Sequence, residues 1–423
     1  MTRDFIPGST LTITPEDLVA SLQSDAVWLD GGGGRSIVTW GPREVAVNEN
    51  DWEDAGRRLS AGAPAGEPFA GGVVGSVAYD GRRSWLARVE GAAIYSDGTW
   101  TIDGSPSFRA QARRALERAV PLPPAPPAPA LRSVRTMDQA VYEGRVRRIL
   151  AWIAEGDCYQ VNLSRAVVAE GVGDPFVAYR RLSHLARAPY AAWLRPSPEY
   201  AVLSASPELL LAADGERVWS EPIKGTRPRH GDPVADRALA GELRTSEKDL
   251  AELVMIVDLV RNDLGRVART GSVTWEKRRV TAHANVHHAS QIVRATLGDG
   301  QDSWAALGAL FPAGSITGAP KIRACQRIAE VEDEPRGLYC GTIGFTGGRT
   351  ARWNVAIRTA EWSPAAGGTL TWHVGGGIVA DSDPTEEWKE TVAKGTTMAR
   401  AFGDVSDEGR LPSYSRQQGS FCS

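Results

Sequence analysis

The sequence predicts an α+β protein, and three observations lead to this class. Short β-like runs broken by glycines fill the first third of the 423 residues. A proline-rich stretch follows at residues 121–130, and beyond it helical patterns alternate with short strands. A chain of this length exceeds the usual size of a single core, so we expect one large domain or two fused domains.

The proline-rich stretch PLPPAPPAPA marks the predicted domain boundary. Proline lacks an amide donor and fixes φ, so an extended connector is expected here. We therefore predict a β-rich region over residues 1–130 that ends in this linker, a second domain over 131–403, and a disordered polar tail over 404–423. The four glycines at 31–34 are predicted to form a flexible turn, since no helix start follows them.

Composition limits the classes of function. The chain carries 48 Lys and Arg against 51 Asp and Glu, a formal net charge of -3, with both signs mixed along its length. This balance argues against nucleic-acid binding, and no apolar run reaches the ~20 residues that a membrane helix needs. The four cysteines are widely spaced, without a zinc pattern or a disulfide framework. We expect a cytoplasmic protein with no nucleic-acid or membrane partner.

Three helix starts are predicted beyond the linker. SEKD at 246–249 fits a capping box. DPTE at 383–386 places proline at a first helical position, and TGAP at 317–320 predicts a third helix start. The first start is followed by an apolar stripe at helical spacing, formed by Leu253, Ile256, Val257, Val260 and Leu264.

Three acidic side chains are candidates for a metal site. Glu252 lies at the edge of the apolar stripe, and Glu387 and Glu390 share one face of their helix because they are three residues apart. Carboxylates without a His or Cys partner would suit a hard ion such as Mg²⁺. The alternative is that acids early in a helix only complement its dipole, which explains Glu387 better than Glu390.

Glycine-rich segments and one lysine are candidates for ligand contact. Residues 375–377, all glycine, follow a β-like run and leave main-chain N–H groups open to a ligand, although a tight turn or bulge is an equal alternative. GSITGAPK at 314–321 points a helix N-terminus outward, which favours an anion. In EPIKGTRPR, the prolines and Gly225 restrict Lys224, whose burial would free a neutral amine. From composition alone, a solvated surface loop is the better interpretation of this segment.

Seven blocks of the sequence occur in a characteristic order. They are GDCYQVNLSRAV (156–167), SASPELLL (204–211), EPIKGTRPR (221–229), SEKDLAELVMIVDLVRNDLGRVA (246–268), LFPAGSITGAPK (310–321), AIRT (356–359) and GGGIVADS (375–382). In sequence and in order, these blocks resemble the chorismate-utilising enzymes, which include anthranilate, aminodeoxychorismate, isochorismate and salicylate synthases. The resemblance covers Met137 to Arg400, and a glycine-rich block at 71–80 extends it. It implies an anthranilate synthase component I-like fold, with antiparallel β-sheets packed face to face and flanked by helices. Residues 131–403 would then form the catalytic domain, with chorismate in a cleft.

The resemblance also implies a role for each site residue. Glu252, Glu390 and Glu387 match carboxylates that hold Mg²⁺, which in turn holds the ring carboxylate of chorismate. Arg358 matches an arginine that binds the enolpyruvyl carboxylate, where a bidentate guanidinium fits. The other residues expected to bind substrate are Tyr339, Gly375, Gly376, Gly377, Ser315 and Lys394. The expected catalytic residues are Lys224, Glu208 as acid/base near the ring hydroxyl, Gln160, Thr226 and His288.

Two positions predict which reaction is catalysed. Isochorismate and salicylate synthases place a lysine general base where this chain has Gln160, and an amide cannot deprotonate water at neutral pH. Aminodeoxychorismate synthases carry the lysine found here at 224, whereas anthranilate synthases have a small residue. The amine would attack C2 of chorismate with loss of the C4 hydroxyl, and ammonia would enter at C4 as the lysine leaves. We therefore predict Mg²⁺-dependent synthesis of 4-amino-4-deoxychorismate, towards p-aminobenzoate.

The source of ammonia is expected to be another subunit. No cysteine of this chain lies in a nucleophile elbow of the glutaminase type, so ammonia is expected from a separate glutamine amidotransferase in a heterodimer. One alternative is anthranilate synthase component I, which predicts a small residue at 224. The other is a catalytically silent regulatory subunit, which would have lost one of Glu208, Lys224, Glu252 or Glu390.

Overall fold

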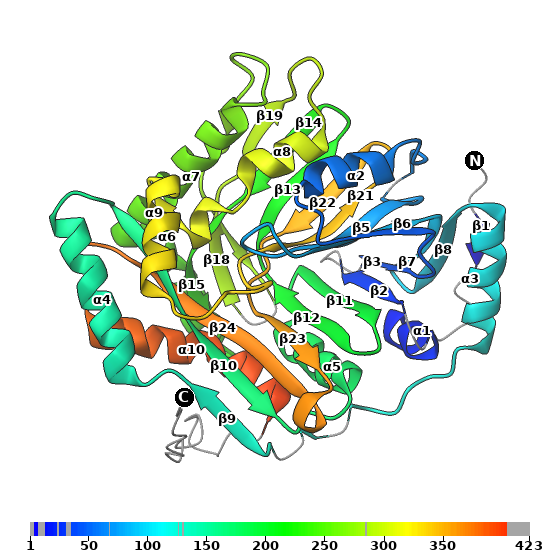
Figure 1. The fold of residues 1–423 in the computed structure, drawn as a ribbon, viewed down its shortest axis with the longest axis horizontal. Coiled ribbons are helices and arrows are strands. Elements are labelled where there is room, and N and C mark those ends of the chain that lie inside the picture. Colours follow the sequence, from blue (N-terminus) through cyan, green and yellow to red (C-terminus); the bar gives the residue numbers. More distant parts are fainter. Residues whose placement is uncertain are drawn as a thin grey trace.

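A computed structural model describes residues 4–6, 13–22, 25–30, 35–66, 68–125, 127–128, 131–283 and 286–403. Two large sheets and one small sheet make up its centre, and helices surround them (Figure 1). Every pairing of named strands in this part of the chain is antiparallel.

The first large sheet combines strands from the whole length of the chain. In spatial order they are β1 (Asp4–Ile6), β8 (Thr99–Gly104), β7 (Gly91–Ser96), β3 (Arg35–Thr39), β2 (Val27–Asp30), β11 (Tyr190–Ser197), β12 (Tyr200–Ser206), β23 (Thr359–Ser363), β24 (Thr369–Ile378), β10 (Gln160–Glu170) and β20 (Gly318–Ala319). A further strand, β9 (Ser133–Thr136), also pairs with β10.

Two further sheets complete the centre of the molecule, a second large sheet and a small one. The second has the order β16 (Thr274–Trp275), β19 (Val293–Thr296), β14 (Arg217–Glu221), β13 (Leu209–Asp214), β22 (Thr350–Asn354), β21 (Thr342–Thr346), β5 (Gly72–Val77), β6 (Ser84–Val89) and β4 (Glu44–Val47). The small sheet has the order β15 (Ile223–Pro228), β18 (Val286–Ser290) and β17 (Arg279–Ala282).

The two large sheets pack face to face, as predicted. Apolar side chains from both sheets meet in one buried cluster, which includes Ile37, Val74, Val89, Leu194, Val202, Ile343 and Phe345. Several of these strands are buried on both faces, so they are apolar along most of their length. Because β2 pairs with β11 and β5 pairs with β21, strands from before and after residue 130 share both sheets. The boundary at residue 130 stays a prediction.

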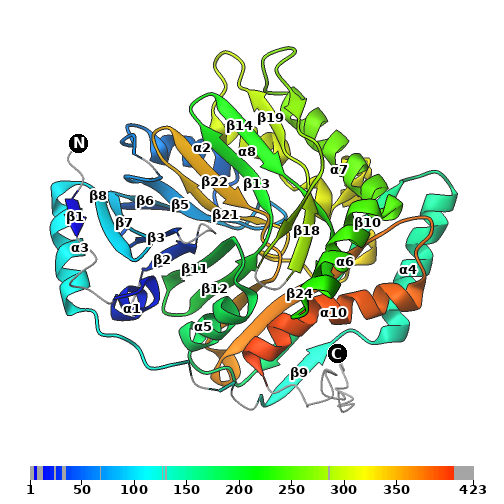
Figure 2. The same cartoon turned by 180° about the vertical axis from the view of Figure 1, so that it is seen from behind.

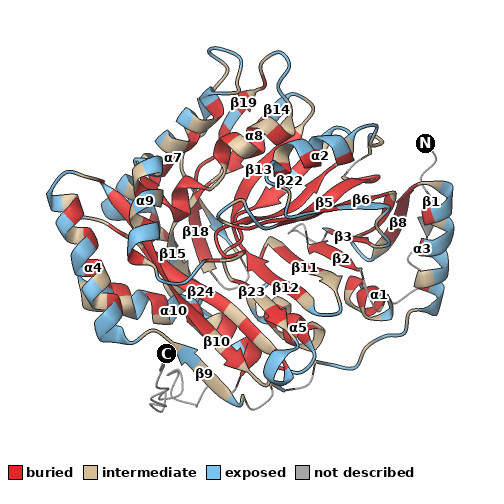
Figure 3. Ribbon diagram, viewed as in Figure 1, coloured by how far each residue is buried: buried red, intermediate tan, exposed pale blue. Residues whose placement is uncertain are grey.

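Helices cover the outer faces of the sandwich. On the first sheet lie α1 (Pro15–Ser21), α3 (Pro106–Arg118), α5 (Pro175–Ala186) and α10 (Pro384–Phe402), and Figure 2 shows α10 beside β24. On the second sheet lie α2 (Trp52–Ser60), α7 (Glu247–Gly265) and α8 (Ser303–Leu310). Two helices pack against β10, namely α4 (Gln139–Ala154) and α9 (Lys321–Val331), while α6 (Pro233–Thr245) contacts the small sheet. Two short 3-10 helices are η1 (Gly314–Ile316) and η2 (Ala365–Gly367). Buried residues concentrate on the strands, and the helices expose one face (Figure 3).

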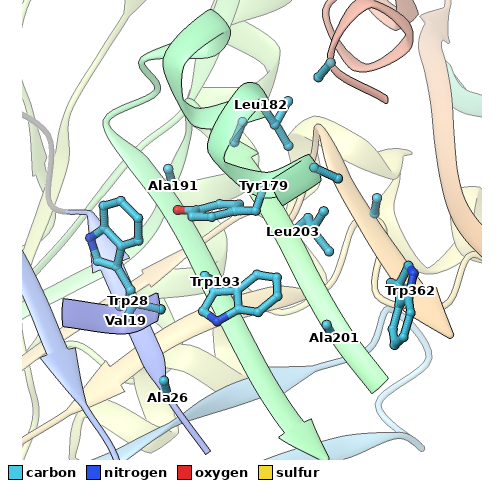
Figure 4. Close-up of a cluster of buried hydrophobic side chains, with 14 of the residues drawn as sticks. Val19, Ala26, Trp28, Tyr179, Leu182, Ala191, Trp193, Ala201, Leu203 and Trp362 are labelled. Carbon is cyan, nitrogen blue, oxygen red and sulfur yellow. The ribbon is translucent and has the colours of Figure 1, made fainter. Parts of the chain in front are cut away.

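Aromatic side chains fasten α5 to the first sheet (Figure 4). The ring of Tyr179 lies 5.4 Å from that of Trp28, edge to face, and 5.6 Å from that of Trp193. These three side chains are buried, together with Leu182 and Leu203 of the same cluster. Tilted and edge-to-face aromatic pairs add to the free energy that burial of their area provides. This cluster therefore contributes strongly to the attachment of α5.

Two of the three predicted helix starts are confirmed. Ser246 caps α7, since its side chain accepts from Asp249 N–H, and all five residues of the predicted stripe are buried on that helix. Asp383 caps α10, with proline at the first helical position. The start at 317–320 is wrong, because α9 begins only at Lys321 and has no side-chain cap. Residues 318–319 pair with β10 instead, so residues 317–319 do not form the first turn of that α-helix.

The proline-rich stretch at 121–130 is described in part. Residues 121–125 and 127–128 lie in neither helix nor strand, and Arg180 of α5 donates a hydrogen bond of 2.6 Å to the carbonyl oxygen of Pro123. The glycines at 31–34 and the tail at 404–423 lie outside the described residues. Among the helices that are described, none is long and apolar enough to cross a membrane.

Candidate active site

A β-bulge in the small sheet orients Lys224. Ile223 of β15 pairs with Ser290 and Thr226 pairs with His288, so two residues, Lys224 and Gly225, oppose a single residue of β18. Such a bulge bends the strand and turns a side chain away from its regular direction. Gly225 has a φ of +84°, and a Cβ there would lie 2.8 Å from a side-chain carbon of Asp249 in α7. Glycine is therefore required beside the lysine, and the surface-loop interpretation of this segment is wrong.

The Lys224 amine lies in the interior of the molecule. Its side chain is only 13% exposed, and its Nζ lies 3.8 Å from Glu252 Oε2 of α7. Burial lowers the pKa of Lys224 and the nearby Lys394 lowers it further, whereas Glu252, Glu208 and Glu390 act in the opposite direction. The neutral amine is therefore more accessible at ordinary pH than in a solvated lysine.

Glu208 lies between β12 and β13 and is 4% exposed. Burial raises the pKa of this carboxyl to about 7, against the hydrogen bond from Ser315, the charge of Lys224 and the Ile223 N–H. Ser315 lies in η1, and its hydroxyl donates to Glu208 Oε1 over 2.7 Å. A carboxyl with such a pKa can both donate and accept a proton near neutral pH.

Charged side chains of α10 converge over the glycines of β24. A Cβ built on Gly376 would lie 3.1 Å from Glu387 Oε2 and 3.4 Å from Glu390 Oε1. Lys394 Nζ would be 3.8 Å away, and it binds Glu390 Oε1 at 2.6 Å and the carbonyl oxygen of Gly375 at 3.1 Å. The absence of a side chain at residue 376 thus leaves room for two carboxylates and an ammonium.

The two acids of α10 have different environments. Burial raises the pKa of Glu387, which is 7% exposed, although Ser382 donates to its Oε1 over 2.6 Å. For Glu390, burial acts to raise the pKa, but Lys394 together with Lys224 outweighs it, and the net shift is downward. The surroundings therefore stabilise the charged form of Glu387 less than that of Glu390.

Two of the three predicted Mg²⁺ ligands lie close together in this arrangement. Glu387 Oε2 is buried without a hydrogen-bond partner, and it faces the same space over Gly376 as Glu390 Oε1. Glu252, the third predicted ligand, is turned to Lys224 instead. Within the described part of the chain, no three His, Cys, Asp or Glu side chains form a metal-binding group. The Mg²⁺ site stays a prediction.

The glycines at 375–377 are part of a strand. They lie within β24 and pair with residues 162–164 of β10 in unbroken register, so the turn or bulge considered as an alternative is excluded. Gln160, at the start of β10, is fully buried, and neither atom of its amide has a partner. Its Nε2 would lie 3.0 Å from a Cβ on Gly377. An unpaired buried amide beside glycine backbone favours a polar ligand at this place.

A second group of predicted residues surrounds His288. Its Nδ1 lies 3.0 Å from the Thr226 hydroxyl, and the residue is 3% exposed. Burial lowers the pKa of His288 to about 3, and nearby Arg358 contributes to the shift, so the imidazole is neutral. Arg358 has a left-handed backbone with φ of +51°, and burial lowers its pKa. Tyr339 is buried and stacks on His373, with ring centroids 5.4 Å apart.

The structure brings most of the predicted residues into two neighbouring groups linked by β15. Lys224 belongs to the group with Glu208 and the α10 acids, while Thr226 belongs to the group with His288. Three further side chains near these groups are buried and were not predicted from the sequence, namely Ser382, Glu332 and Arg336. For Glu332 and Arg336, the signal in the sequence is their spacing of four residues, which is typical of an ion pair on a helix. The proline at 335 argues against a helix there, so the spacing did not predict the pair.

Comparison with known proteins identifies the class. The family model "chorismate binding enzyme" matches residues 37–400. The chain is 38% identical to anthranilate synthase component 1 of Streptomyces coelicolor over 387 residues, which cover 81% of this chain and 75% of the relative. It is 44% identical to aminodeoxychorismate synthase component 1 of Salmonella typhimurium over 261 residues, 61% of this chain and 56% of the relative.

A solved structure agrees with this class. Anthranilate synthase component I from Streptococcus pneumoniae matches with a TM-score of 0.77 and 28% identity, covering 86% of this chain and 92% of that chain. The chain belongs to the family of chorismate binding enzymes. The predictions of family and of an anthranilate synthase component I-like fold are confirmed. The relatives carry two different enzyme names, so similarity leaves the reaction open.

Proposed function

We propose that the protein is an aminodeoxychorismate synthase that converts chorismate to 4-amino-4-deoxychorismate, towards p-aminobenzoate. The observation that carries the proposal is the Lys224 amine, buried on a bulge and close enough to Glu208 that each shifts the pKa of the other. A buried lysine with lowered pKa is suited to act as a nucleophile. The chain retains Glu208, Lys224, Glu252 and Glu390, so nothing favours a silent regulatory subunit.

The proposed reaction has two steps that balance. In the first, Lys224 Nζ forms a bond to C2 of chorismate, the ring double bonds shift, and the C4–O bond breaks. Glu208 donates its proton to the departing hydroxyl, which leaves as water. In the second, ammonia forms a bond to C4 and the C2–Nζ bond breaks, which restores the neutral Lys224. Glu208 takes up the proton that the new C4 ammonium releases.

The carboxyl groups of chorismate need partners of positive charge. Arg358 is suited to one of them, since a guanidinium binds a carboxylate in bidentate fashion. For the other carboxyl group of chorismate we propose Mg²⁺ bound by Glu387 and Glu390. Glu252 would become a third ligand after it separates from Lys224. The unpaired Glu387 Oε2 supports this assignment, because a buried carboxylate oxygen requires a partner. When bound, the ion would supply positive charge that holds and polarises a substrate carboxylate.

The ammonia is proposed to come from a separate glutamine amidotransferase. The words "component 1" in the names of the relatives support a second component. The purified chain should therefore consume chorismate with ammonium salt and Mg²⁺ but not with glutamine. Turnover with glutamine by the chain alone would contradict this assignment, and full activity in excess chelator would contradict the Mg²⁺ assignment.

The mechanism is tested at Lys224. Guanidinium, with a pKa above ~12, cannot shed its proton, so Lys224→Arg should lose as much activity as Lys224→Ala. Mass spectrometry of the wild type with chorismate and no ammonia should show an adduct that maps to Lys224. Near-normal turnover by Lys224→Arg, with no adduct trapped, would refute the covalent step.

Anthranilate synthase is the second candidate. Of the two sequence relatives compared above, the one that matches the larger share of this chain carries that name, which favours direct attack of ammonia at C2. This reaction does not use a nucleophilic lysine. Identification of the product by mass separates the two candidates, because anthranilate forms with loss of pyruvate whereas 4-amino-4-deoxychorismate keeps all the carbon of chorismate.

A further inference from the structure

Arg336 and Glu332 form a buried ion pair, and the proposed reaction gives neither residue a role. Arg336 is 3% exposed, and its Nε lies 2.8 Å from Glu332 Oε2. The guanidinium also lies over the ring of Tyr79, 4.6 Å from the centroid. Burial of a charged pair is costly, and it stabilises the fold only when further hydrogen bonds satisfy both groups. Its other partners therefore decide what it does.

The remaining donors of Arg336 join two separate segments of the site. Nη1 donates to the carbonyl oxygen of Ile316 in η1 over 2.9 Å, and Nη2 donates to the carbonyl oxygen of Asn162 in β10 over 2.9 Å. Ile316 follows Ser315, whose hydroxyl binds Glu208. One guanidinium thus adds a side-chain bridge between η1 and β10 to the main-chain hydrogen bond of 2.8 Å from Asn162 N–H to the carbonyl oxygen of Thr317.

Glu332 holds the same strand from the other side of the pair. Its Oε1 accepts from the N–H of Ser164 over 2.7 Å and from the hydroxyl of Ser164 over 2.9 Å. Ser164 and Asn162 pair in register with Gly375 and Gly377 of β24. Both ends of the ion pair therefore act on the strand that positions the site glycines.

We infer that Arg336 and Glu332 are positioning residues of the active site, which hold η1 against β10 so that Ser315 stays on Glu208. Neither residue is inferred to contact the reacting atoms. Their positioning role rests on the proposed acid function of Glu208. A planar guanidinium with donors in three directions is required, because a lysine ammonium cannot reach Ile316, Asn162 and Glu332 with the same geometry.

The test is Arg336→Lys, with Arg180→Lys as the matched control. Arg180 is 5% exposed and pairs with Glu16 on the outer face of the first sheet, away from η1. Both variants should lower Tm, but only Arg336→Lys should lower kcat for chorismate consumption, by at least about tenfold with KM within about twofold. Unchanged kcat in Arg336→Lys, or an equal loss of kcat in Arg180→Lys, would overturn the inference.

A double variant shows whether the effect passes through Ser315. Ser315→Ala removes the hydrogen bond that the ion pair is inferred to maintain, so adding Arg336→Lys to it should lower kcat by less than about twofold further. Losses that multiply would overturn the inference. If Arg336→Lys yields no folded protein, Glu332→Gln carries the same test with the same outcomes. The assay measures loss of chorismate, which either product would cause. A wild type that consumes no chorismate would therefore refute the proposed function itself, whereas the outcomes above test the positioning role.

Discussion

Removal of the Ser315 hydroxyl should shift the pH dependence of catalysis in a known direction. The hydroxyl donates to Glu208 Oε1 over 2.7 Å and stabilises the charged carboxylate, so its loss in Ser315→Ala raises the pKa of Glu208. A hydrogen bond to a charged group contributes about 1.5–3 kcal/mol, and 1.36 kcal/mol corresponds to about one pKa unit. From the present value of about 7, the pKa should rise by about one to two units.

The assay is kcat for chorismate loss between about pH 5 and pH 10. In the proposed reaction Glu208 must be protonated to donate to the departing hydroxyl, so the inflection that reports Glu208, near pH 7 in the wild type, should move upward by the same one to two units. Lys224 must be neutral, so its titration gives the other inflection of the profile. Ser204→Ala is the matched control, because Ser204 is also buried but its hydroxyl binds Thr359 over 2.8 Å. An inflection that stays near pH 7 in Ser315→Ala, or moves down, would refute the role assigned to Glu208.

Three further outcomes are expected. Because burial raises the folded-state pKa of Glu208 from 4.5 to about 7, stability present below about pH 4.5 is lost as pH rises through 7. Glu208→Gln should therefore raise Tm relative to wild type at pH 8 but not at pH 4.5, and equal differences at both pH values would contradict this. Gly376→Ala, whose Cβ would lie 3.1 Å from Glu387 Oε2, should weaken Mg²⁺ binding, so that half-maximal activity needs a higher Mg²⁺ concentration. Gly144→Ala, in open space, should leave that concentration unchanged. Unaltered Mg²⁺ titration would count against the site. Trp193→Ala should cost about 3–5 kcal/mol in urea unfolding, and a loss below about 1 kcal/mol would show that the cluster is dispensable.

Local patterns predicted the fold where local interactions decide the structure. The stripe of α7 and the caps at Ser246 and Asp383 depend on residues within one or two helical turns, and the structure has them as predicted. The start at 317–320 failed because Gly318, with φ of +140°, lets the chain pair with Gln160 and Val161, which are distant in sequence. Tertiary pairing overrode a local signal there.

The glycines at 375–377 show the same limit. Glycine runs are typical of turns, but ten residues of β24 have a partner in β10, and this ladder keeps the run extended. The sequence indicated why glycine is needed here, namely that other groups approach the backbone closely, but it did not show which groups these are. They are side chains of α10 and Gln160, brought there by the fold.

The candidate residues followed from motifs, whereas their geometry did not. No pattern in the sequence indicates that Lys224 and Gly225 together oppose one residue of β18. Nor does it indicate that Arg336 binds the carbonyl of Asn162, 174 residues away. Contacts at such separations depend on the assembled sheets, and they decide which side chains meet.

The location of Lys224 explains why similarity alone leaves the reaction open. Most of the described strands lie in the two large sheets, whose buried side chains constrain one another through close packing. Lys224 is outside both, on the three-stranded sheet, where the bulge and Gly225 direct a single side chain into the site. Under the proposed mechanism, a different residue at 224 would alter the chemistry while few packing contacts of the sandwich change. An enzyme that aminates C2 and one that aminates C4 can therefore share the fold, the chorismate-binding residues and comparable identity to this chain, so the nucleophile must be tested directly.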